Sequence, residues 1–368
     1  MAGVLYIDTS FAKITVKPVH PTFGAEIEVP DWKNVDDDTV REISRAANKY
    51  AFCIFRNTGL DDTDHVKFSQ RLGELDNVKR FITGDRTLRY QYYELFDAGN
   101  IADDGSLLDP NSARGHTNRG NQLFHTDSSY NFRRAGFSLL RAVELPPKGT
   151  GGHTEFADTR TAFVELPDAV KKELVKNNYV GCHTLAHSRK MGSPEYFENL
   201  DPSQFPMARH YLAQIHEGSG RVNLYVGAHL HHIEGLSDDE STKLRDFLNK
   251  HVEQPKYVYT FNWEQPGDMV MWDNRATLHR AAGGSFAGKY RRDLRRTTVH
   301  DDSANAWGLN DAEGASALGY QLDDKTQELP ELTPANAAPA TNTPAPAAIA
   351  APAAPAAIVA PAAIAATS

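Results

Sequence analysis

The sequence has few of the features that mark secreted or membrane proteins. It contains only two cysteines, Cys53 and Cys182, which lie far apart in apolar or mixed sequence. Two cysteines are too few for a disulfide scaffold, so we expect a reducing compartment and packed thiols. The first thirty residues lack a basic segment followed by an apolar run. Before the tail, no stretch approaches the roughly 18 apolar residues that cross a bilayer. We therefore expect a cytoplasmic protein without a membrane partner.

Positive charge is also scarce. The formal net charge is −9, and the sequence has no long block of Lys or Arg. Such a chain lacks the electrostatic surface that holds nucleic acid or acidic lipid, so we expect a small-molecule partner and no nucleic acid. The sequence leaves a homo-oligomer open.

The composition changes abruptly near Thr333. From there to Ser368 the chain is almost only Ala, Pro, Thr, Asn, Ile and Ser. The recurring prolines interrupt helices, and the segment buries too little surface to offset its chain entropy. We predict one folded domain over residues 1–332 and a disordered Ala/Pro-rich tail over residues 333–368. The tail is a spacer, a docking site or a dispensable extension.

Short strand-like runs separated by turn residues dominate the folded part. They occupy residues 137–145, 177–184, 212–217, 222–228, 257–263, 268–272 and 292–299. Apolar residues at helical spacing predict helices over 36–50 and 62–75, and a capping-box sequence at 237–240 predicts a third helix. The pattern indicates a mainly β fold with flanking helices, an antiparallel sandwich or jelly roll whose mouth holds a ligand.

The strongest chemical signal is the pair His125 and Asp127, separated by one residue. On a strand both side chains would share a face and point at one metal ion. A third ligand, His279, follows an apolar strand and a polar turn. Two histidines and one carboxylate form the facial triad of non-haem iron(II) oxygenases, which leaves three positions for a bidentate cosubstrate and dioxygen.

A His-x-Asp pair alone is a weak signal, because the chain has 15 histidines. His229, His231 and His232 are an alternative cluster that could suggest zinc. No acidic residue or cysteine stands at a matching spacing beside them, so we rank this cluster below the triad.

A run of arginines at 291–296 is the third signal. If it is a strand, Arg292 and Arg296 share one face with Leu294, and the other face carries mixed charges that suit solvent. Two guanidinium groups inside a barrel require anions, because an unpaired buried charge costs several kcal/mol on the order seen in proteins. The planar fork of Arg clasps a carboxylate, so a dicarboxylic keto acid fits. The alternative is a basic strand that solvent covers on both faces.

These residues together resemble the taurine and 2,4-dichlorophenoxyacetate dioxygenase family, TauD/TfdA, over about residues 20–302, and most closely its TfdA-like branch. The best stretches are Phe124-His125-Thr126-Asp127-Ser128-Ser129, Gly151-Gly152-His153-Thr154-Glu155-Phe156, Gly227-Ala228-His229, Trp272-Asp273-Asn274-Arg275 and Arg291-Arg292-Asp293-Leu294-Arg295-Arg296. The stretch between His279 and Arg292 is slightly longer than usual, and the tail lies outside the family pattern.

The resemblance implies a double-stranded β-helix with Fe(II) held by His125, Asp127 and His279. It also implies 2-oxoglutarate held by Thr154 and Arg292, with O2 as the oxidant. Arg296 matches a second arginine near the inner carboxylate and the substrate's acidic group. Retention of Asp127 argues against halogenation, so hydroxylation with release of succinate and CO2 is the expected reaction; desaturation and ring closure share the same ligands.

Counting the charges of the iron, Asp127, 2-oxoglutarate, Arg292 and Arg296 leaves about +1 under ordinary protonation. A monoanionic carboxylate, sulfonate or amino acid would neutralise it. We expect the substrate to be walled by residues 76–93 and 111–123 and by the surroundings of His183, His187 and His216, with Lys79, Arg80 and Arg89 as candidates for extra anion contacts. Two other hypotheses remain. One is a jelly-roll hydrolase or isomerase that uses zinc or manganese without 2-oxoglutarate. The other is a non-catalytic binding module that acts through the tail.

Overall fold

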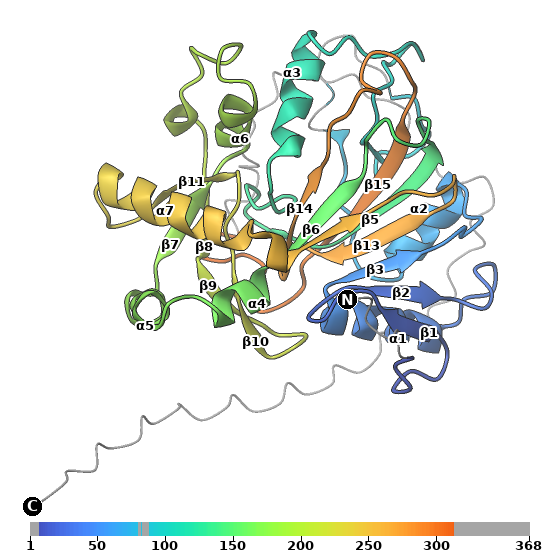
Figure 1. Cartoon of the computed structure of the whole chain (residues 1–368), viewed down its shortest axis with the longest axis horizontal. Helices are drawn as coiled ribbons and strands as arrows, with labels where there is room; N and C mark the ends of the chain where they lie inside the picture. Colours follow the sequence, from blue (N-terminus) through green and yellow to red (C-terminus); the bar gives the residue numbers. More distant parts are fainter. Residues whose placement is uncertain (1–6, 80–81, 83–87, 313–368) are drawn as a thin grey trace, which may run out of the picture. The chain divides into compact units, whose positions relative to one another are not determined.

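The computed structural model describes residues 7–79, 82 and 88–312, and its centre is a jelly roll of two antiparallel layers (Figure 1). The larger layer is a seven-stranded sheet in the order β1 (Thr15–Pro18), β2 (Ala25–Glu28), β3 (Phe52–Phe55), β13 (Met269–Asp273), β5 (Ala135–Glu144), β15 (Asp293–His300) and β4 (Phe96–Asp97). The smaller layer has the order β12 (Val258–Phe261), β6 (Thr154–Asp158) and β14 (Thr277–Ala281). Only β2 and β3 pair in parallel among these strands. The predicted fold class is therefore confirmed.

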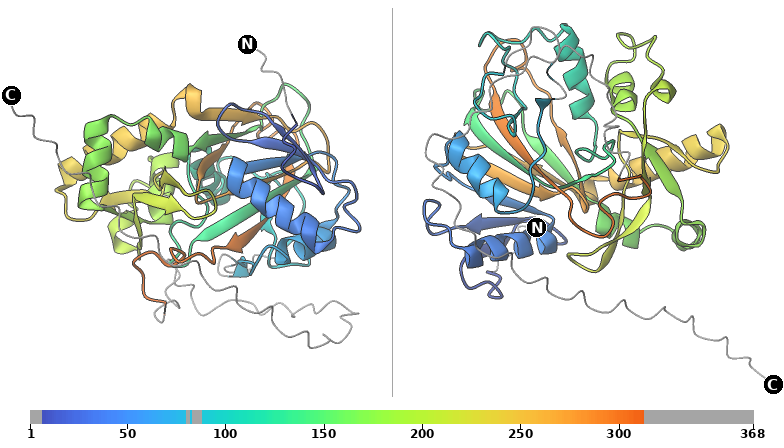
Figure 2. Two further views of the ribbon diagram at one scale, coloured as in Figure 1. Left: turned by 90° about the horizontal axis from the view of Figure 1, so that it is seen from below. Right: turned by 180° about the vertical axis from the view of Figure 1, so that it is seen from behind.

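The space between the two layers is filled by large apolar side chains. Trp272 and Leu294 from the larger sheet pack with Phe156 and Phe261 from the smaller one, and all four are fully buried. Alternation along each strand places these residues on the inner faces. The opposite face of the larger sheet packs against α1 (Asp37–Tyr50) and α2 (Asp62–Gln70), as Figure 2 shows for α1.

The remaining elements form a second region beside the smaller sheet. It contains a three-stranded sheet and a hairpin, together with helices that pack on a separate apolar cluster. Its strands are β7 (Val180–His183), β8 (Ala208–Tyr211), β9 (Ala213–His216), β10 (Arg221–Leu224) and β11 (Leu230–Ile233). The other helices are α3 (Ala113–Arg119), η2 (Gly120–Gln122), α4 (Thr159–Val164), α5 (Asp168–Asn177), α6 (Leu185–Gly192), η3 (Pro202–Gln204), α7 (Asp238–Val252) and η4 (Pro255–Tyr257).

The predicted helix starts agree with the structure, and α1 also ends at Tyr50 as predicted. The capping box at Ser237 and Glu240 is present, and α1 begins after its Asp36 cap. By contrast, α2 ends at Gln70 rather than residue 75, because the chain bends there and Gly73 adopts a positive φ of 151°. The predicted strand 177–184 is shortened because α5 extends to Asn177. Helices α3 to α6 were not predicted, since their apolar patterns are short.

Both cysteines are buried and free, as predicted. In the described part of the chain, no helix has the length and apolar character needed to cross a membrane. The predicted tail, residues 333–368, lies outside the described residues, so the boundary at residue 332 stays a prediction.

A network of buried charges stabilises the end of β13. Asp273 is fully buried and accepts hydrogen bonds from Arg275, at 2.8 Å, and from His216, also at 2.8 Å. Arg275 also contacts Asp301 at 3.0 Å, and Asp301 binds Arg134 at 2.8 Å. Burial alone would raise the pKa of Asp273, but Arg275 and His216 outweigh that effect and hold the pKa well below its ordinary value.

We predict that Arg275→Met lowers the free energy of unfolding by about 3–5 kcal/mol at pH 7, because it leaves Asp273 buried and charged without its arginine and with the His216 contact alone. Since the folded-state pKa of Asp273 is depressed, its contribution is present above the unfolded pKa of roughly 3.9 and is lost as the pH falls through the folded value. The difference between the two proteins should therefore shrink on acidification. Urea denaturation between pH 7 and pH 3 measures it.

The control is Lys243→Met, which removes an exposed ion pair with Asp239. This change should have little effect at either pH. A loss of stability by Arg275→Met that stays constant down to pH 3 would contradict the role assigned to Asp273.

Candidate metal centre and active site

A backbone pairing brings the two histidines of the predicted triad together. The amide of His125 donates to the carbonyl of His279 at 3.0 Å, and the amide of His279 donates back at 2.9 Å. His125 thereby lies beside β14 as the next position of the smaller sheet. The two imidazole rings are 4.3 Å apart between centroids.

The expected strand at 124–127 is replaced by this single bridge. Asp127 belongs to a turn, in which Ser128 has a φ of 54°. The turn still directs the Asp127 carboxylate toward the two rings. Its Oδ1 lies 3.8 Å from the Nε2 of His125 and 3.6 Å from the Nε2 of His279.

Among the described residues, these three form the one group of at least three His, Cys, Asp or Glu side chains whose ligand atoms all lie within 4.8 Å of one another. An ion with bonds of roughly 2.0–2.1 Å and octahedral geometry keeps neighbouring ligand atoms about 3 Å apart. Small side-chain shifts would bring the ligand atoms from their present separations of 3.6 and 3.8 Å to this distance. The donor set of two imidazoles and one carboxylate on one side suits a non-haem iron(II) ion.

Both histidines are in the form that binds metal. Burial lowers the pKa of His125 below its ordinary value and that of His279 well below it, so both rings are neutral at pH 7. The Nδ1 of His125 contacts the carbonyl of Leu123 at 2.7 Å, which requires the proton on that nitrogen. The lone pair of Nε2 is therefore free to face the ion.

The carboxylate of Asp127 is held from behind by residues of β5 and β13. Its Oδ2 accepts a hydrogen bond from Ser138 at 2.8 Å, and Ser138 accepts one from the Asn274 amide at 2.9 Å. The Asn274 oxygen accepts from the Asp127 backbone at 3.2 Å and from the Trp272 indole at 3.0 Å. The Trp272 ring lies 4.5 Å from that of His279. This network leaves Oδ1 directed at the metal position.

Arg296 lies on the inner face of β15 and reaches the same carboxylate. Its Nη1 donates to Oδ1 of Asp127 at 2.6 Å, and its guanidinium lies 4.6 Å from the centre of the Phe96 ring. Burial by itself would raise the pKa of Asp127, but Arg296 and the two imidazoles hold it at about 2. The carboxylate is therefore ionised, as a metal ligand must be.

Arg292 is a buried cation that contacts no carboxylate of the described chain. Its Nε and Nη2 donate to the carbonyl of Gly152, at 3.3 and 3.0 Å, and its Nη1 donates to the carbonyl of Ala98 at 3.1 Å. Three of its five N–H groups are thereby used, and two remain for an anion. Gly152 has a φ of 84°, and a Cβ there would lie 3.2 Å from Arg292 Nε. Burial alone lowers the pKa of Arg292 to about 10, so it stays charged at pH 7.

Thr154 shares the inner face of the smaller sheet with His279. In β6 and β14, Phe156 pairs with His279 and Thr154 pairs with Ala281, so Thr154 lies two positions further along the same face. The hydroxyl of Thr154 accepts a hydrogen bond from the Trp263 indole at 3.2 Å. Its own proton remains available to an acceptor in the interior.

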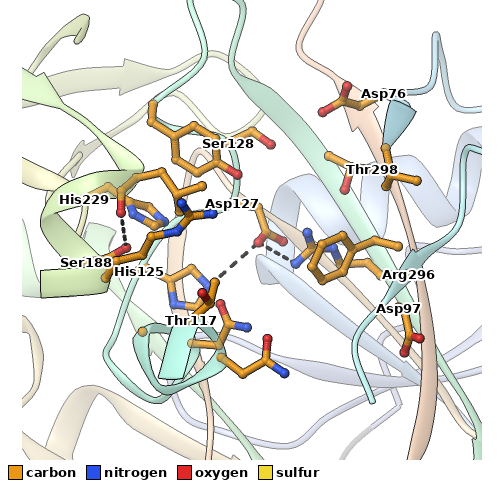
Figure 3. A pocket seen from close by; sticks show the side chains of 18 of the residues that line it. Asp76, Asp97, Thr117, His125, Asp127, Ser128, Ser188, His229, Arg296 and Thr298 are labelled. Carbon is orange, nitrogen blue, oxygen red and sulfur yellow. Dashed lines mark hydrogen bonds and ion pairs between the residues drawn. The ribbon is translucent and has the colours of Figure 1, made fainter. Parts of the chain in front are cut away.

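Two cavities meet at this site. One, of about 500 Å³, is lined by His125, Asp127 and Arg296, and Figure 3 shows Arg296 and His125 on either side of Asp127. The other, of about 260 Å³, is lined by Arg292. Asp97, Asn118 and Asn121 line both, so α3, η2 and the end of β4 form the partition between them.

The predicted walls are partly right. Residues from 76–78, 114–121 and 185–189 line the larger cavity. His183 is fully buried away from it, and His216 is held by Asp273. His229, which we ranked below the triad, lines the cavity with its ring 5.4 Å from that of His125. Of the basic residues considered as extra anion contacts, Arg89 pairs with Asp97 and Asp293, Lys79 lies over the Tyr93 ring, and Arg80 is outside the described residues.

The outer face of the arginine strand also differs from expectation. It is covered by α2 instead of solvent, so Thr297 bonds to Ser69 at 2.7 Å and Arg295 pairs with both Asp62 and Asp293. The inner face has the expected composition, with Leu294 in the core and Arg296 at Asp127.

Sequence reasoning missed Ser138 and the role of Asn274. Ser138 is one small polar residue within an apolar strand, and nothing in the sequence connects it to a position eleven residues earlier. Asn274 belongs to the stretch 272–275 that resembles the family, but its network with Ser138 and Asp127 depends on strands β5 and β13 being neighbours. A single hydroxyl residue within an otherwise apolar run is the one signal that the sequence offers for Ser138.

Comparison with known proteins places these features in context. The family model described as "Taurine catabolism dioxygenase TauD, TfdA family" matches residues 15–298. The chain is 37% identical over 288 residues to the alpha-ketoglutarate-dependent 2,4-dichlorophenoxyacetate dioxygenase of Burkholderia sp. (strain RASC), covering 76% of this chain and 92% of that protein. It is 29% identical over 273 residues to the (S)-phenoxypropionate/alpha-ketoglutarate-dioxygenase of Sphingobium herbicidovorans, covering 72% and 88%.

Solved structures agree with this similarity. The crystal structure of AAD-2 in complex with Mn(II) and N-oxalylglycine matches with a TM-score of 0.69 at 31% identity. The match covers 79% of this chain and 98% of that one.

We predict that Ser138→Ala weakens metal binding roughly 10–100-fold, because the residues that orient a ligand contribute on this scale. The measurement is a titration of the apoprotein with Fe(II) or Co(II) under anaerobic conditions. Ser69→Ala is the matched control, since it removes a buried hydroxyl on the opposite side of the same sheet. Equal affinities for the two variants would show that the hydroxyl does not position Asp127.

Proposed function

The chain belongs to the TauD/TfdA family, on the branch of the 2,4-dichlorophenoxyacetate dioxygenases, and from this membership we propose that it is an Fe(II)- and 2-oxoglutarate-dependent enzyme that hydroxylates a small anionic substrate. Its class is that of an oxidoreductase. The proposed metal ligands are His125, Asp127 and His279, and the proposed 2-oxoglutarate ligands are Thr154 and Arg292, with Arg296 beside them.

The observation that carries the proposal is the environment of Arg292. A buried cation without an acidic partner costs several kcal/mol on the order seen in proteins. A bound anion would offset this cost. Its two free N–H groups form a fork that matches a carboxylate. His125 and Asp127 line the larger cavity, and the cavity lined by Arg292 shares part of its wall. A linear dicarboxylate with a keto group at one end suits this arrangement.

The donor set of the triad fits iron(II), which supplies the activation of dioxygen and the oxidation of a C–H bond when it is bound. The chain's own residues do the remaining work. Leu123 fixes the tautomer of His125, and Ser138 fixes the rotation of the Asp127 carboxylate. Side chains between the sheets exclude water from this side of the site, so the reacting groups are held in one geometry.

Thr154 and Arg292 would hold the distal carboxylate of 2-oxoglutarate. The Thr154 hydroxyl still has its proton to donate, because Trp263 uses only an oxygen lone pair. The AAD-2 structure with Mn(II) and N-oxalylglycine supports a keto-acid cosubstrate for this chain, since N-oxalylglycine has two carboxylates and an oxalyl group like those of 2-oxoglutarate.

The substrate would occupy the larger cavity, with its anionic group near Arg296. The phenoxyacetate and phenoxypropionate named for the relatives are both carboxylates, which supports a small acid as substrate. A cavity of about 500 Å³ suits a molecule of that size. The cytoplasmic location, the absence of nucleic-acid and membrane partners and the oligomeric state stay predictions.

We predict that anaerobic addition of Fe(II) and then 2-oxoglutarate to the folded protein produces a visible charge-transfer absorption. With air and a panel of small carboxylates and sulfonates, the same protein should release succinate. Deleting residues 333–368 should leave both signals intact. Absence of both signals from folded protein would refute the proposal, and dependence of all activity on the tail would favour a binding module.

We predict that Arg292→Ala raises the apparent Kd for 2-oxoglutarate by about a hundredfold or more, the equivalent of roughly 3 kcal/mol. Stability should hardly fall, because the change removes an unpaired buried charge. The control is Arg291→Ala, whose side chain is exposed and pairs with Glu144. Activity of Arg292→Ala at the wild-type level without any keto acid would instead favour a metal-dependent hydrolase or isomerase.

A further inference from the structure

A second group of histidines lies outside the triad, on β11 and α6. His231 and His232 are consecutive in β11, and in a regular strand their side chains would point to opposite faces. The pairing of β11 with β7 shifts between Leu230 and His232, so His231 is an extra residue of a β-bulge. The bulge turns the two rings toward each other, and their Nδ1 atoms are 2.9 Å apart. Bulges commonly re-aim a side chain in this way.

A third imidazole lies next to this pair. The ring of His187, from α6, stands perpendicular to that of His231 with 5.2 Å between centroids. All three side chains are half-buried, so an ion from solvent can reach them. Burial with neighbouring positive charge lowers the pKa of His187 to about 3, and burial also lowers the pKa of His231. These two rings are therefore neutral at pH 7 and have lone pairs to give.

The charged neighbours of the group are balanced. Arg245 donates to the His231 carbonyl at 2.7 Å, and Lys190 donates to the Leu200 carbonyl at 2.7 Å. Carboxylates also act on the group: Asp201 and Asp238 on His231, and Glu234 on His232. Glu234 is itself paired with Arg209, so three cations and three carboxylates surround the group. A divalent cation would therefore meet no excess of positive charge.

We propose that His187, His231 and His232 form a second metal site, which takes a divalent ion that prefers imidazole, such as Zn²⁺, Ni²⁺ or Cu²⁺. Two nitrogen ligands on an ion with bonds of roughly 2.0–2.1 Å are about 3 Å apart, which the Nδ1 pair already provides. In the described chain only the triad has three such donor atoms within 4.8 Å of one another, so binding at the second site requires the His187 ring to rotate toward the other two.

The position of the site gives it a structural effect. Helix α6 contributes Leu185, Ser188 and Arg189 to the wall of the larger cavity, and His229 precedes β11 on the same wall. An ion bound between α6 and β11 would tie these two parts of the wall together. A bound ion would therefore slow the local unfolding of α6 without contacting the metal at the triad.

The test is a Zn²⁺ titration of tag-free protein against a chromophoric chelator, in the absence of 2-oxoglutarate and substrate. His279→Gln weakens the triad, so this variant should bind one equivalent of Zn²⁺ at micromolar concentration. His279→Gln/His231→Gln should lose that equivalent. The matched control, His279→Gln/His20→Gln, removes a histidine far from the cluster and should keep it.

A second measurement is independent of stoichiometry. Zn²⁺ should raise the Tm and slow amide hydrogen exchange in α6 of His279→Gln, and should do neither in His279→Gln/His231→Gln. The proposal is overturned if His279→Gln binds no Zn²⁺, which would leave only a hydrogen bond between His231 and His232. It is also overturned if removing His231 changes neither binding nor Tm. Because no turnover is measured, neither result bears on the proposed dioxygenase activity.

Discussion

The two hydrogen bonds between the backbones of His125 and His279 are the contact on which the site depends. They join chain segments that lie far apart in sequence and place both imidazoles on the inner side of the smaller sheet. Because side chains alternate along a strand, a register shift of one residue would turn His279 away from Asp127. The remaining parts of the site, including Ser138 and Arg296 of the larger sheet, are arranged around this pairing.

Arg292, just before β15, and Arg296, within it, both face the interior but differ in how their charge is compensated. Arg296 is paired with Asp127, whereas Arg292 is satisfied only by the carbonyls of Gly152 and Ala98. Carbonyl groups solvate a guanidinium but do not neutralise it. The interior thus keeps one positive charge without an acidic partner, in a cavity that shares part of its wall with the cavity of the candidate metal centre.

Much of the architecture could be predicted from the sequence, because turn residues separate the strand-like runs and the capping-box signal at Ser237 is strong. The convergence of His125, Asp127 and His279 was also predictable, although on a turn rather than a strand. Contacts that depend on which strands are neighbours were not predictable. Ser138 meets Asp127 only because of sheet order, and α2 covers Arg295 only because of how the helix packs. Short helices such as α6 carry too few residues to show a period.

The indole of Trp272 is a natural optical probe beside the candidate metal centre. Its ring is fully buried, 4.5 Å from the His279 imidazole, and its N–H is fixed by Asn274, which also holds the Asp127 backbone. The chain has only four tryptophans, and a second one, Trp263, bonds to Thr154. The fluorescence of these two indoles is therefore sensitive to changes at His279 and at Thr154, without any added label.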